Sequence, residues 1–248
     1  MIFKEYGTDK PETMIFLHGG GLSWWNYRAE AEMLQPEYHI VLPVLDGHAD
    51  SPVPFTSIED NAEELIEFID EHFGGSVLLI GGLSLGSQVL LEMLSRRKDI
   101  CRYALVESAS VIPSKLTNAL IGPAFGSSYG LIRNRSFAKM QFSSLHMDGH
   151  FFEEYYRDTC KIAKADMIAF LKANTSYALK PSVADTAARV HAVAGAKETG
   201  TILRSADAIR KAIPGCTVNL LPGLRHGEFS LNHPDRYTAY LKKMMETG

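Results

Sequence analysis

The chain has 248 residues, of which 46% are hydrophobic and 22% charged, as in ordinary globular proteins. A net charge of −4 without a basic run argues against a nucleic-acid-binding protein. Three scattered cysteines, at positions 101, 160 and 216, do not form a disulfide framework or a metal-binding spacing. No secretory signal or stretch of about 20 uncharged apolar residues is visible, so we expect a cytoplasmic protein without a membrane span.

The first part of the chain alternates between strand and helix patterns. Short apolar runs predict buried strands, and apolar residues at helical spacing predict amphipathic helices. Ser57 and Asp60 resemble a capping box in front of one such helix, and Gly74 follows its end. The expected strands are 2–6, 14–17, 39–42, 77–80 and 103–106, and the expected helices are 26–35, 58–73 and 85–95.

The alternation stops in the middle of the chain and then resumes. Between residues 111 and 188 only helical patterns are visible, near 151–165 and 166–173, and Phe, Tyr and Met are frequent. Strands are expected again at 190–194 and 217–221, with helices at 202–213 and from Pro234 to the end. We therefore expect a core domain of residues 1–110 and 189–248, and a helical cap of residues 111–188 inserted into it.

Strands that alternate with helices predict an α/β fold, with a mainly parallel, doubly wound sheet of about seven strands. Such sheets bind ligands at the carboxyl ends of their strands. The polar residues expected at those ends are His18, Ser84, Glu107, Glu198 and His226. These side chains, which are distant in sequence, should therefore meet at one edge of the sheet.

The most informative motif is Gly82-Leu83-Ser84-Leu85-Gly86. It follows a buried strand and opens an amphipathic helix, which is the context of a nucleophile elbow. In such an elbow the serine occupies a strained turn, and the flanking glycines let neighbouring backbone pass close by. We identify Ser84 as the candidate nucleophile.

A serine nucleophile needs a base and an acid that orients the base. His226 lies between glycines just after the last expected strand, and is the candidate base. Glu198 follows the 190–194 strand and is the preferred acid, with Glu107 as its main rival and Asp207 less well placed. His18 is interpreted as structural or as a support for the site, and His48 as solvated or bracing its loop. His146 and His150 do not form a metal-binding motif.

Acyl transfer also requires donors for an oxyanion. The amide of Leu85, at the start of the elbow helix, is one candidate. Gly20 or Gly21 can supply the second, because a glycine amide approaches a ligand without side-chain obstruction, and we choose Gly20.

Five motifs in this order resemble the α/β-hydrolase family: FLHGGG, LPVLDGHADS, GGLSLG, GAKE and GLRHGE. Ala49 stands where the family usually has glycine, the acid is Glu instead of the commoner Asp, and one edge strand is missing. The resemblance implies a serine esterase or thioesterase with a helical cap over its substrate pocket. Aromatic residues of the cap, and Trp24 and Trp25, are expected either to line that pocket or simply to pack in the core.

The sequence therefore predicts a serine hydrolase that cleaves a small-molecule carboxylic ester or thioester through an acyl-enzyme, without a cofactor or metal. A lyase, a cofactor-free oxygenase or a ligand-binding receptor on the same scaffold is the alternative. The sequence leaves a homodimer open.

Overall fold

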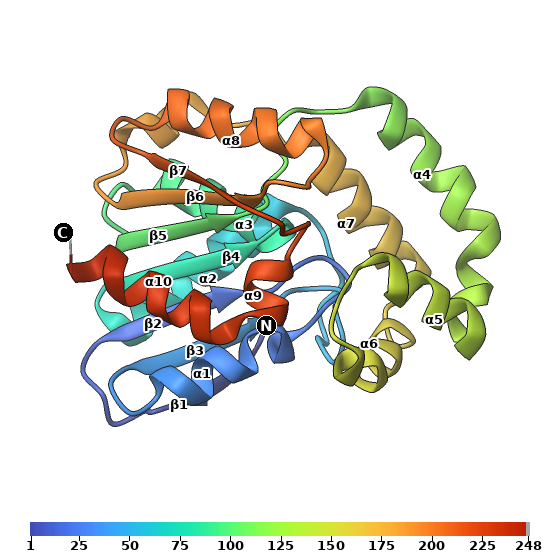
Figure 1. Ribbon diagram of the computed structural model, residues 1–248, viewed down its shortest axis with the longest axis horizontal. Coiled ribbons are helices and arrows are strands. Elements are labelled where there is room, and N and C mark those ends of the chain that lie inside the picture. Colours follow the sequence, from blue (N-terminus) through green and yellow to red (C-terminus); the bar gives the residue numbers. More distant parts are fainter. Residues whose placement is uncertain (247–248) are drawn as a thin grey trace.

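The computed structural model describes residues 1–246, apart from the side chains of residues 126–128. A seven-stranded sheet forms the centre of the molecule, in the order β1-β3-β2-β4-β5-β6-β7 (Figure 1). Only the pairing of β1 with β3 is antiparallel, and all other neighbours are parallel. The strands are β1 (Ile2–Tyr6), β2 (Thr13–Leu17), β3 (His39–Val44), β4 (Val77–Leu83), β5 (Cys101–Glu107), β6 (Arg189–Gly195) and β7 (Thr217–Leu221).

Helices cover both faces of this sheet. Apolar residues of β2 alternate between the faces, so that Ile15 and Leu17 contact one cluster and Met14 and Phe16 the other. The first cluster includes α2 (Ile58–Phe73), α3 (Leu85–Arg96) and α8 (Gly200–Ala212), and the second includes η1 (Trp24–Tyr27), α1 (Arg28–Leu34), α9 (Glu228–Asn232) and α10 (Pro234–Glu246). The predicted α/β fold with a doubly wound, mainly parallel sheet is confirmed.

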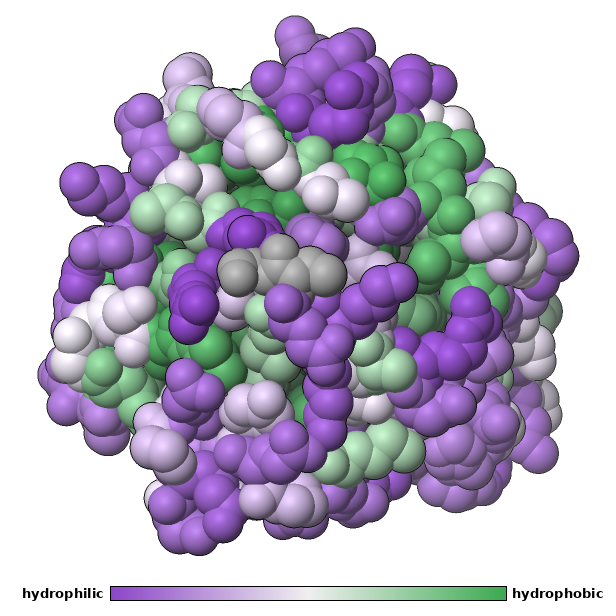
Figure 2. Space-filling view, turned by 60° about the vertical axis from the view of Figure 1, so that its left-hand side comes forward, coloured by the Kyte–Doolittle hydropathy of each residue, from purple (hydrophilic) through white to green (hydrophobic). Residues whose placement is uncertain are grey.

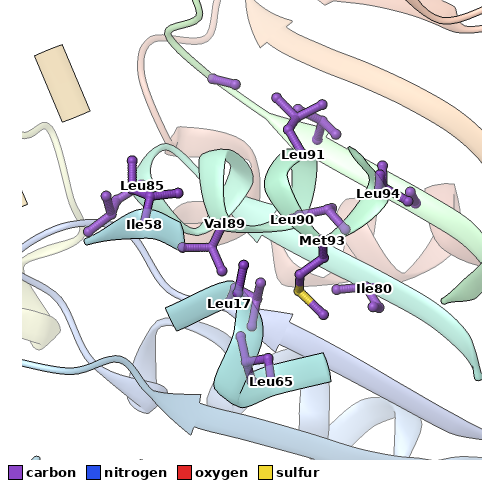
Figure 3. Packing of buried hydrophobic residues seen from close by; sticks show 14 of the residues in the cluster. Leu17, Ile58, Leu65, Ile80, Leu85, Val89, Leu90, Leu91, Met93 and Leu94 are labelled. Atoms are coloured by element: carbon purple, nitrogen blue, oxygen red, sulfur yellow. The ribbon is translucent and has the colours of Figure 1, made fainter. Parts of the chain in front are cut away.

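The helix that follows the elbow is the most deeply buried. Every residue of α3 from Leu85 to Leu94 is buried. Its apolar side chains pack against β2, β4 and α2, where Figure 3 shows Val89 and Met93 close to Leu17 and Leu65. Burial of one such leucine contributes about 1.5–3 kcal/mol, so this packing fixes the position of the elbow firmly.

The segment between β5 and β6 is helical throughout its described secondary structure. It contains α4 (Lys115–Ser128), η2 (Tyr129–Arg133), α5 (Arg135–Ser144), η3 (Gly149–Phe151), α6 (Phe152–Thr159), α7 (Lys164–Ser176) and η4 (Pro181–Asp185). Helices α4 to α7 lie beyond the carboxyl ends of the strands (Figure 1). The division into a core and a cap at residues 111–188 stays a prediction that is compatible with this order; we call residues 111–188 the cap segment.

Local signals explain which elements were predicted well. Ser57 Oγ accepts a hydrogen bond from the Asp60 amide at 2.9 Å, and Gly74 ends α2 with φ 66°. In contrast, no sequence pattern predicted α4, which contains Pro123, or α5. The short helix α9 was also missed, because its five residues are too few to show a helical period.

None of the helices in residues 1–246 combines the length and the apolar character needed to cross a lipid bilayer. Figure 2 brings forward the side of the molecule away from the cap segment, where hydrophilic residues surround separate apolar groups.

Candidate active site

Ser84 occupies the sharp turn between β4 and α3. Its φ of 52° and ψ of −107° are unusual for a residue with a side chain. The Ser84 amide donates to the Glu107 carbonyl at 2.9 Å, which holds the turn against the next strand. A Cβ at Gly82 would lie 2.6 Å from the Gly86 backbone, and a Cβ at Gly86 would lie 2.2 Å from the Leu17 carbonyl. Both glycines are therefore required by the tight passage of the backbone.

His226 and Glu198 lie on neighbouring loops, after β7 and β6. The His226 Nδ1 is 2.7 Å from Glu198 Oε2. A backbone bond of 2.9 Å from the Lys197 amide to the Leu224 carbonyl joins the two loops. Because Nδ1 faces the carboxylate, it carries the proton, and Nε2 is the ring nitrogen that can accept one. In the described part of the chain, no hydrogen bond joins Ser84 Oγ to His226, although both residues line the same cavity.

The second oxygen of Glu198 has two further donors. Ser108 Oγ donates to Oε1 at 2.6 Å, and the Gly195 amide donates to the same oxygen at 2.9 Å. Burial raises the pKa of Glu198, but the bonds from His226, Ser108 and Gly195 outweigh it and hold the pKa below its usual value. The carboxylate thus stays ionised beside the imidazole.

In the described residues, neither rival acid is hydrogen-bonded to His226. Glu107 is fully buried, which raises its pKa to about 7, and its Oε1 accepts from the Ser230 amide at 3.3 Å. Asp207 lies on the surface of α8 and pairs with Arg210 and Lys211. Of the three acids considered from the sequence, only Glu198 is hydrogen-bonded to the candidate base.

Gly20 lies beside Leu85, the first residue of α3. A Cβ at Gly20 would lie 3.6 Å from the Cβ of Leu85, so the two residues are neighbours. Within residues 1–246, neither amide donates to a protein acceptor. Asn26 Oδ1 accepts from the Gly19 amide at 3.2 Å and helps to fix this turn. The Leu85 amide at the N-terminus of α3 and the Gly20 amide in the loop after β2 are donors of the kind that suits an oxyanion.

His18 and His48 are buried behind this turn and lie edge to face at 5.1 Å. His18 Nε2 accepts from the Leu45 amide at 3.1 Å, so its Nδ1 carries the proton and donates to the Gly19 carbonyl at 2.9 Å. Burial lowers the pKa of His18 to about 3 and that of His48 to about 4. Both are therefore neutral, which agrees with a structural role.

Ser84, His226 and Glu198 all line a cavity of about 490 Å³. Its apolar walls come from the core and from the cap segment, through Leu22, Leu83, Leu145, Met147, Ile202 and Leu231. The cap aromatics do not line it: Phe142 packs against Phe152 and Tyr155 inside the cap segment. Trp25 is buried and donates to Asp158 at 2.9 Å. Of the two open interpretations, core packing therefore applies to these residues.

Sequence reasoning missed Ser108 and the stretch 144–147. Ser108 lies directly after β5 and has φ 56°, but a serine beside Glu107 carries no sequence signal for a contact with residue 198. Residues 144–147 belong to the cavity wall although they follow no recognisable motif. Among residues 1–246, no three His, Cys, Asp or Glu side chains gather as metal ligands would.

No curated protein matches the sequence. Among solved structures, an esterase from Exiguobacterium antarcticum is 15% identical with a TM-score of 0.83, covering 98% of this chain and 94% of that one. The enol-lactonase from Burkholderia xenovorans is 12% identical with a TM-score of 0.80, covering 99% and 96%. A putative alpha/beta hydrolase family protein from Desulfitobacterium hafniense is 21% identical with a TM-score of 0.77, covering 98% and 100%.

At these identities the solved structures are similar in fold. A model of the alpha/beta hydrolase family matches residues 14–239. This range contains the elbow, both loops that carry Glu198 and His226, and the glycine turn after β2. The resemblance inferred from five sequence motifs is thereby confirmed, and the chain belongs to the alpha/beta hydrolase family.

Proposed function

We propose that the protein is a serine hydrolase that cleaves a carboxylic ester or thioester through an acyl-enzyme. The observation that carries the proposal is the 2.7 Å contact between His226 Nδ1 and Glu198 Oε2, at the wall of the cavity that also contains Ser84. Family membership and the esterase and hydrolase neighbours support an enzyme of the α/β-hydrolase class.

In the first half-reaction, Ser84 Oγ attacks the carbonyl carbon of the substrate while His226 Nε2 takes the serine proton. Glu198 holds the ring in the required tautomer and stabilises the imidazolium. The amides of Gly20 and Leu85 donate to the oxyanion, and their loss would cost about 10²–10³ in kcat for each donor. The imidazolium then protonates the leaving alcohol or thiol, and the acyl-serine ester remains.

In the second half-reaction, a water molecule replaces the leaving group. His226 takes a proton from the water, the hydroxide adds to the acyl carbon, and the same two amides stabilise the second oxyanion. Collapse of this intermediate releases the carboxylic acid and returns the proton to Ser84. The side chain of His226 is 49% exposed, which gives water access to the ring.

A fluorophosphonate probe and chromogenic acyl esters and thioesters test the proposal. The wild type should be labelled once and should turn over at least one ester or thioester series, whereas Ser84→Ala should lose both. Ser95→Ala is the matched control, because Ser95 lies near the other end of the same helix and donates to the Glu92 carbonyl. A tight stoichiometric complex without turnover would favour a receptor, and absence of both labelling and turnover would exclude this serine chemistry.

A further inference from the structure

One wall of the cavity is a short loop of the cap segment. Residues 144–147, which we call the wall loop, line the cavity together with Leu83, Ile202 and Leu231 from outside the cap segment. The wall loop connects α5 to η3 and contributes the apolar side chains of Leu145 and Met147. Any acyl chain that extends from Ser84 across this cavity meets these side chains.

The wall loop adopts a tight turn that is unusual for its residues. His146 has φ 56°, in the left-handed region, and its amide donates to the Ser143 carbonyl at 3.3 Å. Residues with a side chain rarely adopt this conformation because it is strained, so other contacts must maintain it.

Asn232 supplies these contacts from the core. Its Nδ2 donates to the His146 carbonyl at 2.8 Å, and its Oδ1 accepts from the Asp148 amide at 3.0 Å. Of the residues outside the cap segment that the structure describes, Asn232 alone hydrogen-bonds to residues 144–148. The side chain therefore bridges both sides of the turn and joins it to the core.

The position of Asn232 links the wall loop to the candidate base. Asn232 is the last residue of α9, the helix that starts two residues after His226. The three residues before Asn232 are buried, and one of them, Leu231, itself lines the cavity. This short buried stretch thus connects the loop that carries His226 with Leu231 in the cavity. It also places Asn232, which holds the wall loop.

We propose that Asn232 determines the acyl-chain specificity of this site by latching the wall loop in place. The latched loop forms, with Leu145 and Met147, an apolar subsite for an unbranched acyl chain of limited length. The cavity volume of about 490 Å³ lies in the lower half of the range for small-molecule sites, about 300–1,000 Å³. This inference rests on the proposed hydrolase function and adds the substrate class to it.

The test compares chain-length profiles in matched variants. Asn232→Ala removes both latch bonds, and Asn232→Asp keeps the acceptor for Asp148 but removes the donor to His146. Asn118→Ala is the control: Asn118 Nδ2 donates to the Lys172 carbonyl at 2.8 Å and ties α4 to α7, away from the cavity. Each protein is assayed with acetyl, butyryl, octanoyl and dodecanoyl esters of 4-nitrophenol, after its melting temperature has confirmed that it folds.

In the wild type, kcat/KM should rise by up to about fourfold for each methylene that the subsite buries. It should fall once the acyl chain is longer than the subsite. In Asn232→Ala the optimum should shift to longer chains, and the preference for octanoyl over dodecanoyl should fall by about tenfold. The chain-length profile of Asn232→Asp should lie between those of the wild type and Asn232→Ala, and Asn118→Ala should keep the wild-type profile. A profile that is the same in the wild type and Asn232→Ala would overturn the proposal.

A binding measurement separates failure of this inference from failure of the hydrolase function. Alkyl methyl ketones of the same chain lengths are titrated into Ser84→Ala, with and without Asn232→Ala, by calorimetry. A length preference that disappears with Asn232→Ala supports the latch even if no ester is turned over. An unchanged preference rejects the latch, even if Ser84 is an active nucleophile.

Discussion

Ser108 Oγ donates a 2.6 Å hydrogen bond to Glu198 Oε1, on the side of the carboxylate opposite His226. Ser108 is 2% exposed, and its amide donates to the Val193 carbonyl at 2.9 Å, so the hydroxyl is held in place by the sheet. The acid of the proposed triad is thus positioned by residues of two adjacent strand ends. Ser108 is a positioning residue that acts through Glu198.

Replacing Ser108 by glycine should lower kcat/KM and shift the acidic limb of its pH profile upward. Glycine suits the positive φ and removes the CH2OH group, and with it the hydroxyl that lowers the pKa of Glu198. Without the hydroxyl, the Glu198 carboxylate becomes more basic and also favours the protonated imidazole. Both effects move the acidic limb of the pH profile to higher pH. We expect a shift of about 0.5–1 pH unit, from a charged hydrogen bond of about 1.5–3 kcal/mol that is partly compensated.

Ser108→Asn provides the rescue variant, because asparagine tolerates a left-handed conformation and offers an N–H donor. It should recover part of both the rate and the profile. A Ser108→Gly protein with a lower melting temperature but an unchanged pH profile would show a purely structural role.

Glu198→Gln and Glu107→Gln should differ strongly in activity. The glutamine amide at position 198 can no longer compensate an imidazolium charge and favours the wrong tautomer, so kcat should fall by about 10³–10⁴-fold. Glu107 accepts from the Ser230 amide instead of from His226, and its glutamine variant should retain kcat within about tenfold. Steady-state kinetics on the best ester decides between them; the assignment of the acid fails if Glu107→Gln alone abolishes turnover.

Glu107→Gln should also change how stability depends on pH. Burial raises the pKa of Glu107 from 4.5 to about 7, so the folded state binds a proton that the unfolded state has released between these values. This contribution to the free energy of unfolding is complete below pH 4.5 and is lost as pH rises through about 7. Glutamine at position 107 does not titrate, so the variant has no such loss. Its free energy of unfolding relative to that of the wild type should therefore rise with pH, by on the order of 3 kcal/mol above pH 7.

Urea denaturation at a series of pH values measures this difference. Glu67→Gln is a suitable control, because Glu67 lies on the exposed face of α2. Parallel stability curves for the wild type and Glu107→Gln would contradict the prediction.

Ala49→Gly should stabilise the protein slightly. Ala49 has φ 43°, which costs an L-residue about 1–2 kcal/mol, whereas the greater freedom of glycine in the unfolded chain costs about 0.5–1 kcal/mol. The net gain should be about 0.5 kcal/mol, measured as a higher denaturation midpoint. Ala208→Gly, within α8, should instead lose about 1 kcal/mol. A loss of similar size at both positions would show that Ala49 is not strained.

The sequence predicted the strands of the sheet more completely than the contacts between the site residues. Strand runs and the motif around Ser84 encode local geometry, so all seven strands and the turn at Ser84 were expected, although β3 and β4 extend beyond the expected ends to Val44 and Leu83. The choice between Glu198 and Glu107 depends on which of two adjacent strand ends faces His226, and only the structure gives that contact. The bonds from Ser108 to Glu198 and from Asn232 to His146 join residues far apart in sequence, and no periodicity or motif records them.

The helical connection from β5 to β6 has an energetic consequence beyond the site. Residues 108–188 separate two strands that are direct neighbours in the sheet. The entropy lost in closing a connection grows only with the logarithm of its length, so that doubling it costs about 0.6 kcal/mol. Length changes in the exposed turns of this connection should therefore cost the sheet little, whereas changes at Phe170 or Val183, which are buried in the main hydrophobic cluster, would remove packing.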